Sequence, residues 1–113
     1  MPSTIRYKWG DVVLVAFPLS DMSGALRRPG LALFDSGDDD VMLARITTQA
    51  IRDRTDLRLV DWQAAGLIAE SVVRLSKIVT IRKSLVDRHL GALSPKDKKT
   101  VRMIRARMFP IPR

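Results

Sequence analysis

The sequence predicts an α+β domain that is mainly antiparallel β. Short apolar runs separated by turn residues occupy roughly the first eighty positions, as in an antiparallel barrel or sandwich. One amphipathic helix follows near the C-terminus. A chain of 113 residues can bury one core and has no room for a second. Residues 1–113 are therefore expected to form a single domain.

Three strands are expected in the first half of the chain. The first is a Val-rich apolar run between Gly10 and Pro18, which suits a buried strand better than a helix of two turns. Residues 18–24 have loop composition, and the acidic segment 35–40 reads as a turn. The expected strands span residues 12–17, 31–34 and 41–47.

The middle of the chain is less regular. Residues 61–66 look like a helical turn, with Asp61 as a possible N-cap and Gly66 as its end. Residues 83–86 could form a further turn of helix. Gly91 fits either a bulge or a C-cap, so the segment around it could be strand or helix. The short strands expected here span residues 57–60, 71–75 and 78–81, with 88–93 as the ambiguous segment.

The C-terminal helix has the clearest local signals. Ser94 offers a hydroxyl at the N-cap, Pro95 suits the first helical position, and Asp97 places a carboxylate in the first turn. Apolar residues then recur at spacings of three and four, which makes one apolar face. Pro110 should end the helix, because it supplies no amide.

Charge points to a polyanionic partner. The net charge is +8, but residues 1–70 carry 8 Lys or Arg against 10 Asp or Glu, while residues 71–113 carry 12 against 2. Phosphate binding to such a basic region releases counterions, so nucleic acid is the leading candidate. An acidic protein partner would satisfy the same charge. Each single cation of the terminal helix could also merely solvate its outer face.

Composition excludes several kinds of site. The chain has no cysteine and one histidine, which excludes a disulfide framework, a thiol nucleophile and a thiolate or histidine zinc centre. No metal and no cofactor is expected. The N-terminus lacks an apolar segment of signal-peptide length, and the longest apolar run is too short to cross a bilayer. The protein is therefore expected in the cytoplasm, without a membrane partner.

Six short segments resemble, in order, the signature motifs of the MazF/PemK toxin endoribonucleases. They lie between about residues 8 and 108, and their order and spacing are more specific than any one of them. The resemblance implies an SH3-like barrel of the CcdB/PemK type with a C-terminal helix, and it favours a strand at residues 88–93. The segments are Gly10-Asp11-Val12-Val13, Arg28-Pro29, Ile46-Thr47-Thr48-Gln49, Ser71-Val72-Val73-Arg74-Leu75, Thr80-Ile81 and Leu90-Gly91-Ala92-Leu93-Ser94-Pro95-Lys96-Asp97.

The resemblance implies a catalytic site built around Arg28, Thr47 and Arg74. Cleavage of RNA without a metal needs a base, an acid and a cation for the charge on the phosphorane. Arg28 suits that charge because its guanidinium is planar and permanently charged. One branch of the family uses the arginine at the position of Arg74, which strand alternation puts on a polar face opposite Val73 and Leu75. The residues alone favour a simpler interpretation, in which Arg28 pairs with a nearby Asp and Thr47 is an ordinary β-branched strand residue.

The general base is not identified by the sequence. That branch has an Asp where this chain has Ser76, and its loop histidine is missing from residues 20–24. An arginine is a poor base at neutral pH. Asp21 is a speculative substitute that could equally be a turn residue, and His89 reads as structural or surface.

Further residues are expected around the RNA. Thr48 and Gln49 would support the site or read a base, or they could be plain polar residues at a strand end. Trp62 reads as a packing residue, while Tyr7 and Trp9 suggest a hydrophobic patch suited to a dimer contact. The expected RNA-binding residues are Asp21, Arg27, Thr48, Gln49, Ser76 and Lys77.

The resemblance implies a toxin of a type II toxin-antitoxin system. Such a toxin inhibits growth by cutting single-stranded RNA, above all mRNA, to a 2′,3′-cyclic phosphate and a 5′-hydroxyl. The implied partners are a second copy of the chain and a cognate antitoxin with an acidic, disordered segment. Two alternatives remain: an inactive nucleic-acid-binding homologue, and a non-enzymatic gyrase poison like the CcdB toxins. Residues 109–113 lack the Trp-Gly-Ile terminus by which those poisons act.

Overall fold

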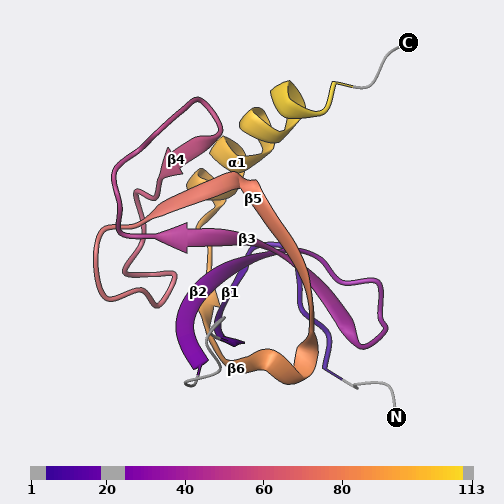
Figure 1. Ribbon diagram of the computed structural model, residues 1–113. Helices are drawn as coiled ribbons and strands as arrows, with labels where there is room; N and C mark the ends of the chain where they lie inside the picture. Colours follow the sequence, from indigo (N-terminus) through magenta and orange to yellow (C-terminus); the bar gives the residue numbers. More distant parts are fainter. Residues whose placement is uncertain (1–4, 19–24, 111–113) are drawn as a thin grey trace.

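The computed structural model describes residues 5–18 and 25–110. Within them the chain forms six strands, a short 3-10 helix and one α-helix (Figure 1). The α+β composition and the C-terminal helix are as predicted. In order, the elements are β1 (Asp11–Pro18), β2 (Ala25–Phe34), β3 (Asp40–Thr47), β4 (Asp56–Arg58), β5 (Val72–Arg82), η1 (Lys83–Leu85), β6 (Val86–Ala92) and α1 (Pro95–Met108).

The strands form one antiparallel sheet in the order β4-β5-β3-β2-β1-β6. The sheet curls strongly, and α1 lies outside the curl (Figure 1). It does not close, because β4 and β6 remain as its two edges. The expected barrel is therefore an open, barrel-like sheet of the predicted fold class.

Side chains that follow one another along a strand belong to two different cores. Because a strand alternates its side chains between faces, this divides the sheet into a helix side and an opposite side. The helix-side core includes Val101 and Ile104 of α1. Pairs of neighbours that divide in this way, helix side first, are Val12 and Val13, Leu31 and Ala32, and Ala44 and Leu43. We call the side away from α1 the site face.

Strand β5 is one bent strand where the sequence predicted two. Ala44 of β3 pairs with Ile78, yet the next residue, Arg45, pairs with Arg74. Residues 75–77 are thus extra on β5 and form a bulge, seen as the sharp bend of this strand in Figure 1. The bulge places the two halves of β5 on differently directed parts of the sheet.

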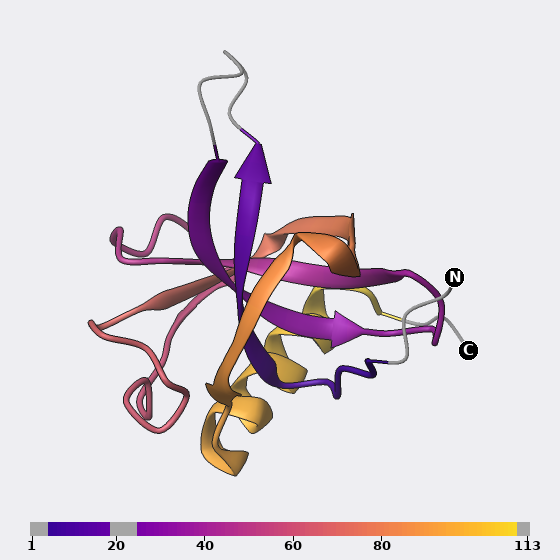
Figure 2. The same ribbon diagram turned by 90° about the horizontal axis from the view of Figure 1, so that it is seen from below.

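Strand β2 begins earlier than the predicted strand at 31–34, at Ala25. Its pairing with β1 continues to Ala25, whereas its pairing with β3 stops at Gly30. The next residue towards the N-terminus is Pro29, which has no amide to donate to a ladder. The first half of β2 therefore follows β1 away from β3, and this hairpin stands out from the body in Figure 2. Most of the predicted loop 18–24 lies outside the described residues.

The predicted helical turn at 61–66 is a hydrogen-bonded turn. The Gly66 amide donates to the Gln63 carbonyl at 3.0 Å, and Gly66 has a φ of +83°. Gly91 lies against this turn, since a Cβ there would meet the Ala65 carbonyl oxygen at 2.5 Å. The extra residue Leu90 interrupts the β1–β6 register beside Gly91, so the bulge and strand alternatives are confirmed for this segment.

Helix α1 begins as its sequence predicts. The Asp97 amide donates to the Ser94 hydroxyl oxygen at 3.2 Å. The buried Asp97 carboxylate also accepts the amides of Val60 and Asp61, at 3.0 and 2.9 Å, and so ties the segment after β4 to the helix. Neither helix in the described part of the chain has the length and apolar character needed to span a bilayer.

Candidate functional site

Arg28 is exposed on the site face of β2. Its guanidinium makes no hydrogen bond or ion pair with any other described residue. The neighbouring Arg27 points to the other face and pairs with Asp87 of β6, with Nε and Oδ2 3.3 Å apart. An Asp pairing of the kind considered for Arg28 is thus made by Arg27, and among the described residues nothing occupies the Arg28 guanidinium, which can bind an anion.

A pocket of about 390 Å³ opens beside Arg28 and crosses β2, β3 and β5. Three cations, Arg28, Arg45 and Lys77, stand around a mainly apolar lining, and no carboxylate lines the pocket within the described residues. Such a site favours a ligand that combines an apolar or aromatic body with negative charge. The other lining residues are Leu26, Pro29, Gly30, Leu43, Ala44, Ile78 and Val79.

Thr47 ends β3 on the same face. Gly30 pairs with Arg45, and Arg28 and Thr47 each lie two residues beyond that pair in the same direction, although Thr47 does not line the pocket. Thr47 is buried, and its hydroxyl oxygen accepts the Gln49 amide at 3.2 Å. That contact orients the hydroxyl and leaves its hydrogen available to donate.

Arg74 lies on the site face opposite Val73 and Leu75, as strand alternation predicted, but it is buried with 1% of its surface exposed. Its Nη1 pairs with Oδ2 of the buried Asp56. Its Nη2 donates to Gln49 Oε1 at 3.1 Å and to the Ala50 carbonyl at 3.2 Å. The guanidinium is therefore surrounded by protein groups and lies outside the lining of the pocket.

The segment between Thr47 and β4 is fastened at several points. The Arg52 amide donates to Asp56 Oδ2 at 2.8 Å, and the Leu75 amide donates to the Thr55 carbonyl at 3.1 Å. Within the segment, the hydroxyl and the amide of Thr55 both donate to Asp53, which lowers the pKa of that carboxyl. These contacts fix the chain that leaves Thr47.

The predicted RNA-binding residues are only partly gathered. Lys77 lines the pocket, and Gln49 is bonded to Arg74. Thr48 is exposed just after β3, Ser76 is exposed in the bulge of β5, and Asp21 lies outside the described residues. Arg27 is exposed but paired with Asp87.

Arg45 and Asp56 were missed by the sequence reasoning. The alternation of Leu43 and Arg45 in the segment 41–47 could have placed Arg45 on the face of Thr47. Asp56 carried no such signal, since it reads as a charged loop residue. His89 is a surface residue, with its Nε2 3.3 Å from Asp11 Oδ1. No group of three or more His, Asp or Glu suited to a metal ion occurs among the described residues.

Residues 8–108 match the sequence profile of the PemK-like, MazF-like toxins of type II toxin-antitoxin systems. This chain belongs to that family. The match spans β1 through α1 and so includes Arg28, Thr47 and Arg74. A search of the curated proteins found no match to the sequence.

Several solved structures share the fold of this chain. An endoribonuclease in complex with its cognate antitoxin, from a mycobacterial species, superposes with a TM-score of 0.71 at 20% identity, covering 91% of this chain and 96% of its own. A second mycobacterial endoribonuclease gives 0.70 at 19% identity, covering 92% and 93%. The Mycobacterium tuberculosis toxin MazF-mt6 gives 0.68 at 22% identity, covering 89% and 99%.

Proposed function

We propose that this toxin is a metal-independent endoribonuclease that acts in the cytoplasm on single-stranded RNA, above all mRNA. Its products would be a 2′,3′-cyclic phosphate and a 5′-hydroxyl. The observation that carries the proposal is a basic pocket at which, within the described residues, Arg28 has no ion-pair partner and no carboxylate forms part of the lining. The family, and the endoribonucleases among the structural neighbours, support it.

In the proposed reaction the 2′-oxygen attacks phosphorus and the bond to the 5′-oxygen breaks. The 2′-hydroxyl loses its proton, and the departing 5′-oxygen gains one. Arg28 would stabilise the charge that builds on the phosphorane, and the Thr47 hydroxyl would donate to one of its oxygens. The general base is not assigned; Asp21, the carboxylate of the segment that joins β1 to β2, is the speculative candidate.

Arg45 and Lys77 extend the positive rim of the pocket and would hold the flanking phosphates. Each phosphate neutralised on a single strand contributes about −0.7 to the slope of log affinity against log salt. Replacing either residue by Ala should therefore weaken RNA binding and flatten that slope by about 0.7. Filter binding between low and moderate salt measures both quantities.

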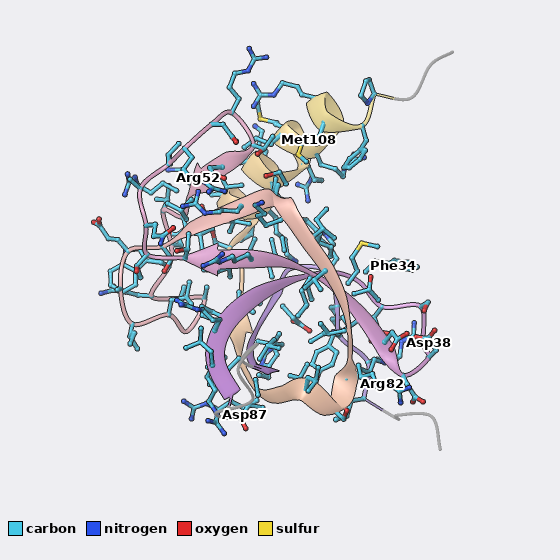
Figure 3. All side chains as sticks on the ribbon, in the orientation of Figure 1. Phe34, Asp38, Arg52, Arg82, Asp87 and Met108 are labelled. Atoms are coloured by element: carbon cyan, nitrogen blue, oxygen red, sulfur yellow. The ribbon has the colours of Figure 1, made fainter. Side chains whose placement is uncertain are left out.

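The proposal is tested by incubating the protein with a long RNA in EDTA. Wild type should cut at discrete positions, and Arg28→Ala should lower the rate by about 10²–10³-fold. Arg82→Ala is the matched control, since it removes an exposed arginine at the far end of β5 (Figure 3). RNA binding without turnover would instead indicate a nucleic-acid-binding homologue. Inhibition of gyrase supercoiling without RNA cleavage would indicate a poison.

A cognate antitoxin is the proposed regulator. One structural neighbour is an endoribonuclease bound to its cognate antitoxin. An acidic, disordered segment that folds on binding would match the cations around the pocket and cover Arg28. Such a peptide should inhibit cleavage competitively with RNA and lose affinity as salt rises.

A homodimer is the proposed assembly. An apolar groove of about 530 Å³ lies between α1 and strands β2, β3 and β5, and its members Phe34 and Phe109 are 59% and 57% exposed. Exposed aromatic surface of this kind, continuous with Met42 and Met108, is characteristic of an interface. We assign it to a second copy of the chain. Light scattering should give twice the chain mass, and Phe34→Glu should give a monomer; a monomeric wild type at about 100 μM would overturn this, because an obligate interface should be far tighter.

A further inference from the structure

We propose that Asp56, Arg74 and Gln49 form a positioning chain that sets the Thr47 hydroxyl for the reaction. This inference rests on the proposed function. It assigns Arg74 a different role from the catalytic one that the family resemblance implied. Arg74 acts through Thr47 and does not touch the RNA.

The contacts run in one direction, from the interior to Thr47. Asp56 Oδ2 pairs with Arg74 Nη1, and Arg74 Nη2 donates to Gln49 Oε1 at 3.1 Å. The Gln49 amide in turn donates to Thr47 Oγ1 at 3.2 Å. Gln49 is thus held at its side chain by Arg74, while its backbone holds the hydroxyl. Two buried charges fix the turn that orients one catalytic oxygen.

The protein acceptors around its guanidinium separate this role of Arg74 from direct catalysis. Arg74 is 1% exposed, and both of its Nη atoms are directed at protein acceptors. A guanidinium that stabilises a phosphorane must reach the phosphate, as the exposed Arg28 can. Arg74 could do so only if the segment from Thr47 to Asp56 moved away.

The pair is also poorly built for stability alone. Asp56 Oδ1 is buried and has no hydrogen-bond partner among the described residues. A buried ion pair often fails to recover its desolvation cost even when all of its atoms are satisfied, and apolar replacements can be equally stable. A stabilising role therefore does not explain an ion pair that leaves one carboxylate oxygen unsatisfied. The position that the pair imposes on Thr47 explains it better.

The test compares cleavage, stability and hydrogen exchange in matched variants. Arg74→Met with Asp56→Leu removes both charges and keeps apolar volume, which avoids burying a lone charge. Gln49→Leu removes the acceptor, and Gln49→Glu keeps an acceptor for Arg74. Arg54→Ala, an exposed arginine in the same segment, is the charge control.

The positioning chain predicts a specific combination of results. The double variant should melt at or above the wild-type temperature, while kcat falls between about tenfold and a hundredfold and KM changes little. Gln49→Leu should lower kcat similarly and add little to the double variant, since both break one chain. Gln49→Glu, which keeps an acceptor for Arg74, should lose less kcat than Gln49→Leu, and Arg54→Ala should keep kcat. Amides of residues 48–56 should exchange faster in the double variant.

Other combinations overturn the proposal. Arg74 would be a direct catalyst if the double variant lost as much kcat as Arg28→Ala and if Gln49→Leu lowered kcat by the same factor in the double variant as in wild type. A lower melting temperature with unchanged kcat would make the pair merely structural. If wild type cleaves no RNA, the proposed function fails, yet hydrogen exchange still decides whether the pair orders residues 48–56. Unchanged exchange there would refute the positioning role independently.

Discussion

Two buried ion pairs lie at opposite ends of β5, and they differ in how completely they are satisfied. In the first pair, Lys83 Nζ lies 2.9 Å from Asp35 Oδ2. The Tyr7 and Gly37 amides also donate to the Asp35 carboxylate, and Lys83 Nζ donates to the Ile5 carbonyl. At the other end, the pair of Asp56 and Arg74 leaves Asp56 Oδ1 with no hydrogen-bond partner in residues 5–18 and 25–110.

The difference separates fold from function. The satisfied pair joins the N-terminal segment, the end of β2 and the start of η1. Its contacts within the described residues hold these segments together and include no residue of the candidate site. Although burial alone would raise the pKa of Asp35, hydrogen bonds from the Tyr7 amide and from Lys83 outweigh it and lower that pKa. The incompletely satisfied pair is connected to the Thr47 hydroxyl through a single residue, Gln49, which contacts both Arg74 and Thr47. Natural proteins tolerate such local costs mainly where a site requires them.

The largest contrast should come from breaking the satisfied pair. Lys83→Met leaves the Asp35 carboxylate buried without its counterion, so the free energy of unfolding should fall by about 3–5 kcal/mol. Urea unfolding followed by circular dichroism measures it. Arg82→Ala, the exposed neighbour, should stay within about 0.5 kcal/mol of wild type. If Lys83→Met lost no more unfolding free energy than Arg82→Ala, the structural role of the pair would be contradicted.

Removing both charges of each pair sharpens the comparison. Asp35→Leu with Lys83→Met deprives the Tyr7 and Gly37 amides of their acceptor, which should cost about 1–3 kcal/mol for each amide that stays dry. In Arg74→Met with Asp56→Leu, the groups that lose a partner belong to the exposed residues 49, 50 and 52, so water can replace it. The unfolding free energy of this double variant should therefore match or exceed that of wild type. Equal losses in the two double variants would remove the distinction between the pairs.

Acid should weaken the satisfied pair next. The folded pKa of Asp35 lies below its unfolded value of 3.8, so its contribution is present above that pH and is lost as the pH falls through the folded pKa. The stability difference between wild type and Asp35→Asn should therefore be greatest near neutral pH and shrink below about pH 4. Urea midpoints measured from pH 7 to pH 3 test this. A difference that grows on acidification would show the wrong sign.

The smallest effect is expected at the surface pair of Arg27 and Asp87. Their atoms are 3.3 Å apart and both side chains are largely exposed, so Asp87→Asn should change the unfolding free energy by less than about 0.5 kcal/mol. The variant releases Arg27 and should bind RNA slightly more tightly at low salt. A measurable gain in binding that persists at high salt would point to a different cause.

Much of the fold could be predicted from the sequence because its signals are local. The Ser94 cap, the apolar period of α1 and the run before Pro18 each determine their own element. The bend of β5 could not be predicted, since it depends on the register of residues 75–77 against β3. Nor could the extension of β2 through Pro29, because the pairing with β1 overrides the local turn signals.

The site was predictable in part for the same reason. Arg28 and Thr47 come from motifs, and the structure places both on the site face, where their catalytic roles remain proposals. The burial of Arg74 depends on Asp56, which reaches it only because β4 pairs with β5. A partner set by strand pairing across eighteen residues has no signature in the sequence.

The most direct test of the account is to map 5′-hydroxyl ends after digestion of a long RNA in EDTA by wild type and by Arg28→Ala. We expect discrete 5′-hydroxyl ends with matching 2′,3′-cyclic phosphates from wild type, and a loss of about 10²–10³-fold in the variant. Ends that carry a 5′-phosphate, or equal cleavage by Arg28→Ala, would contradict an RNA-cleaving site built on Arg28.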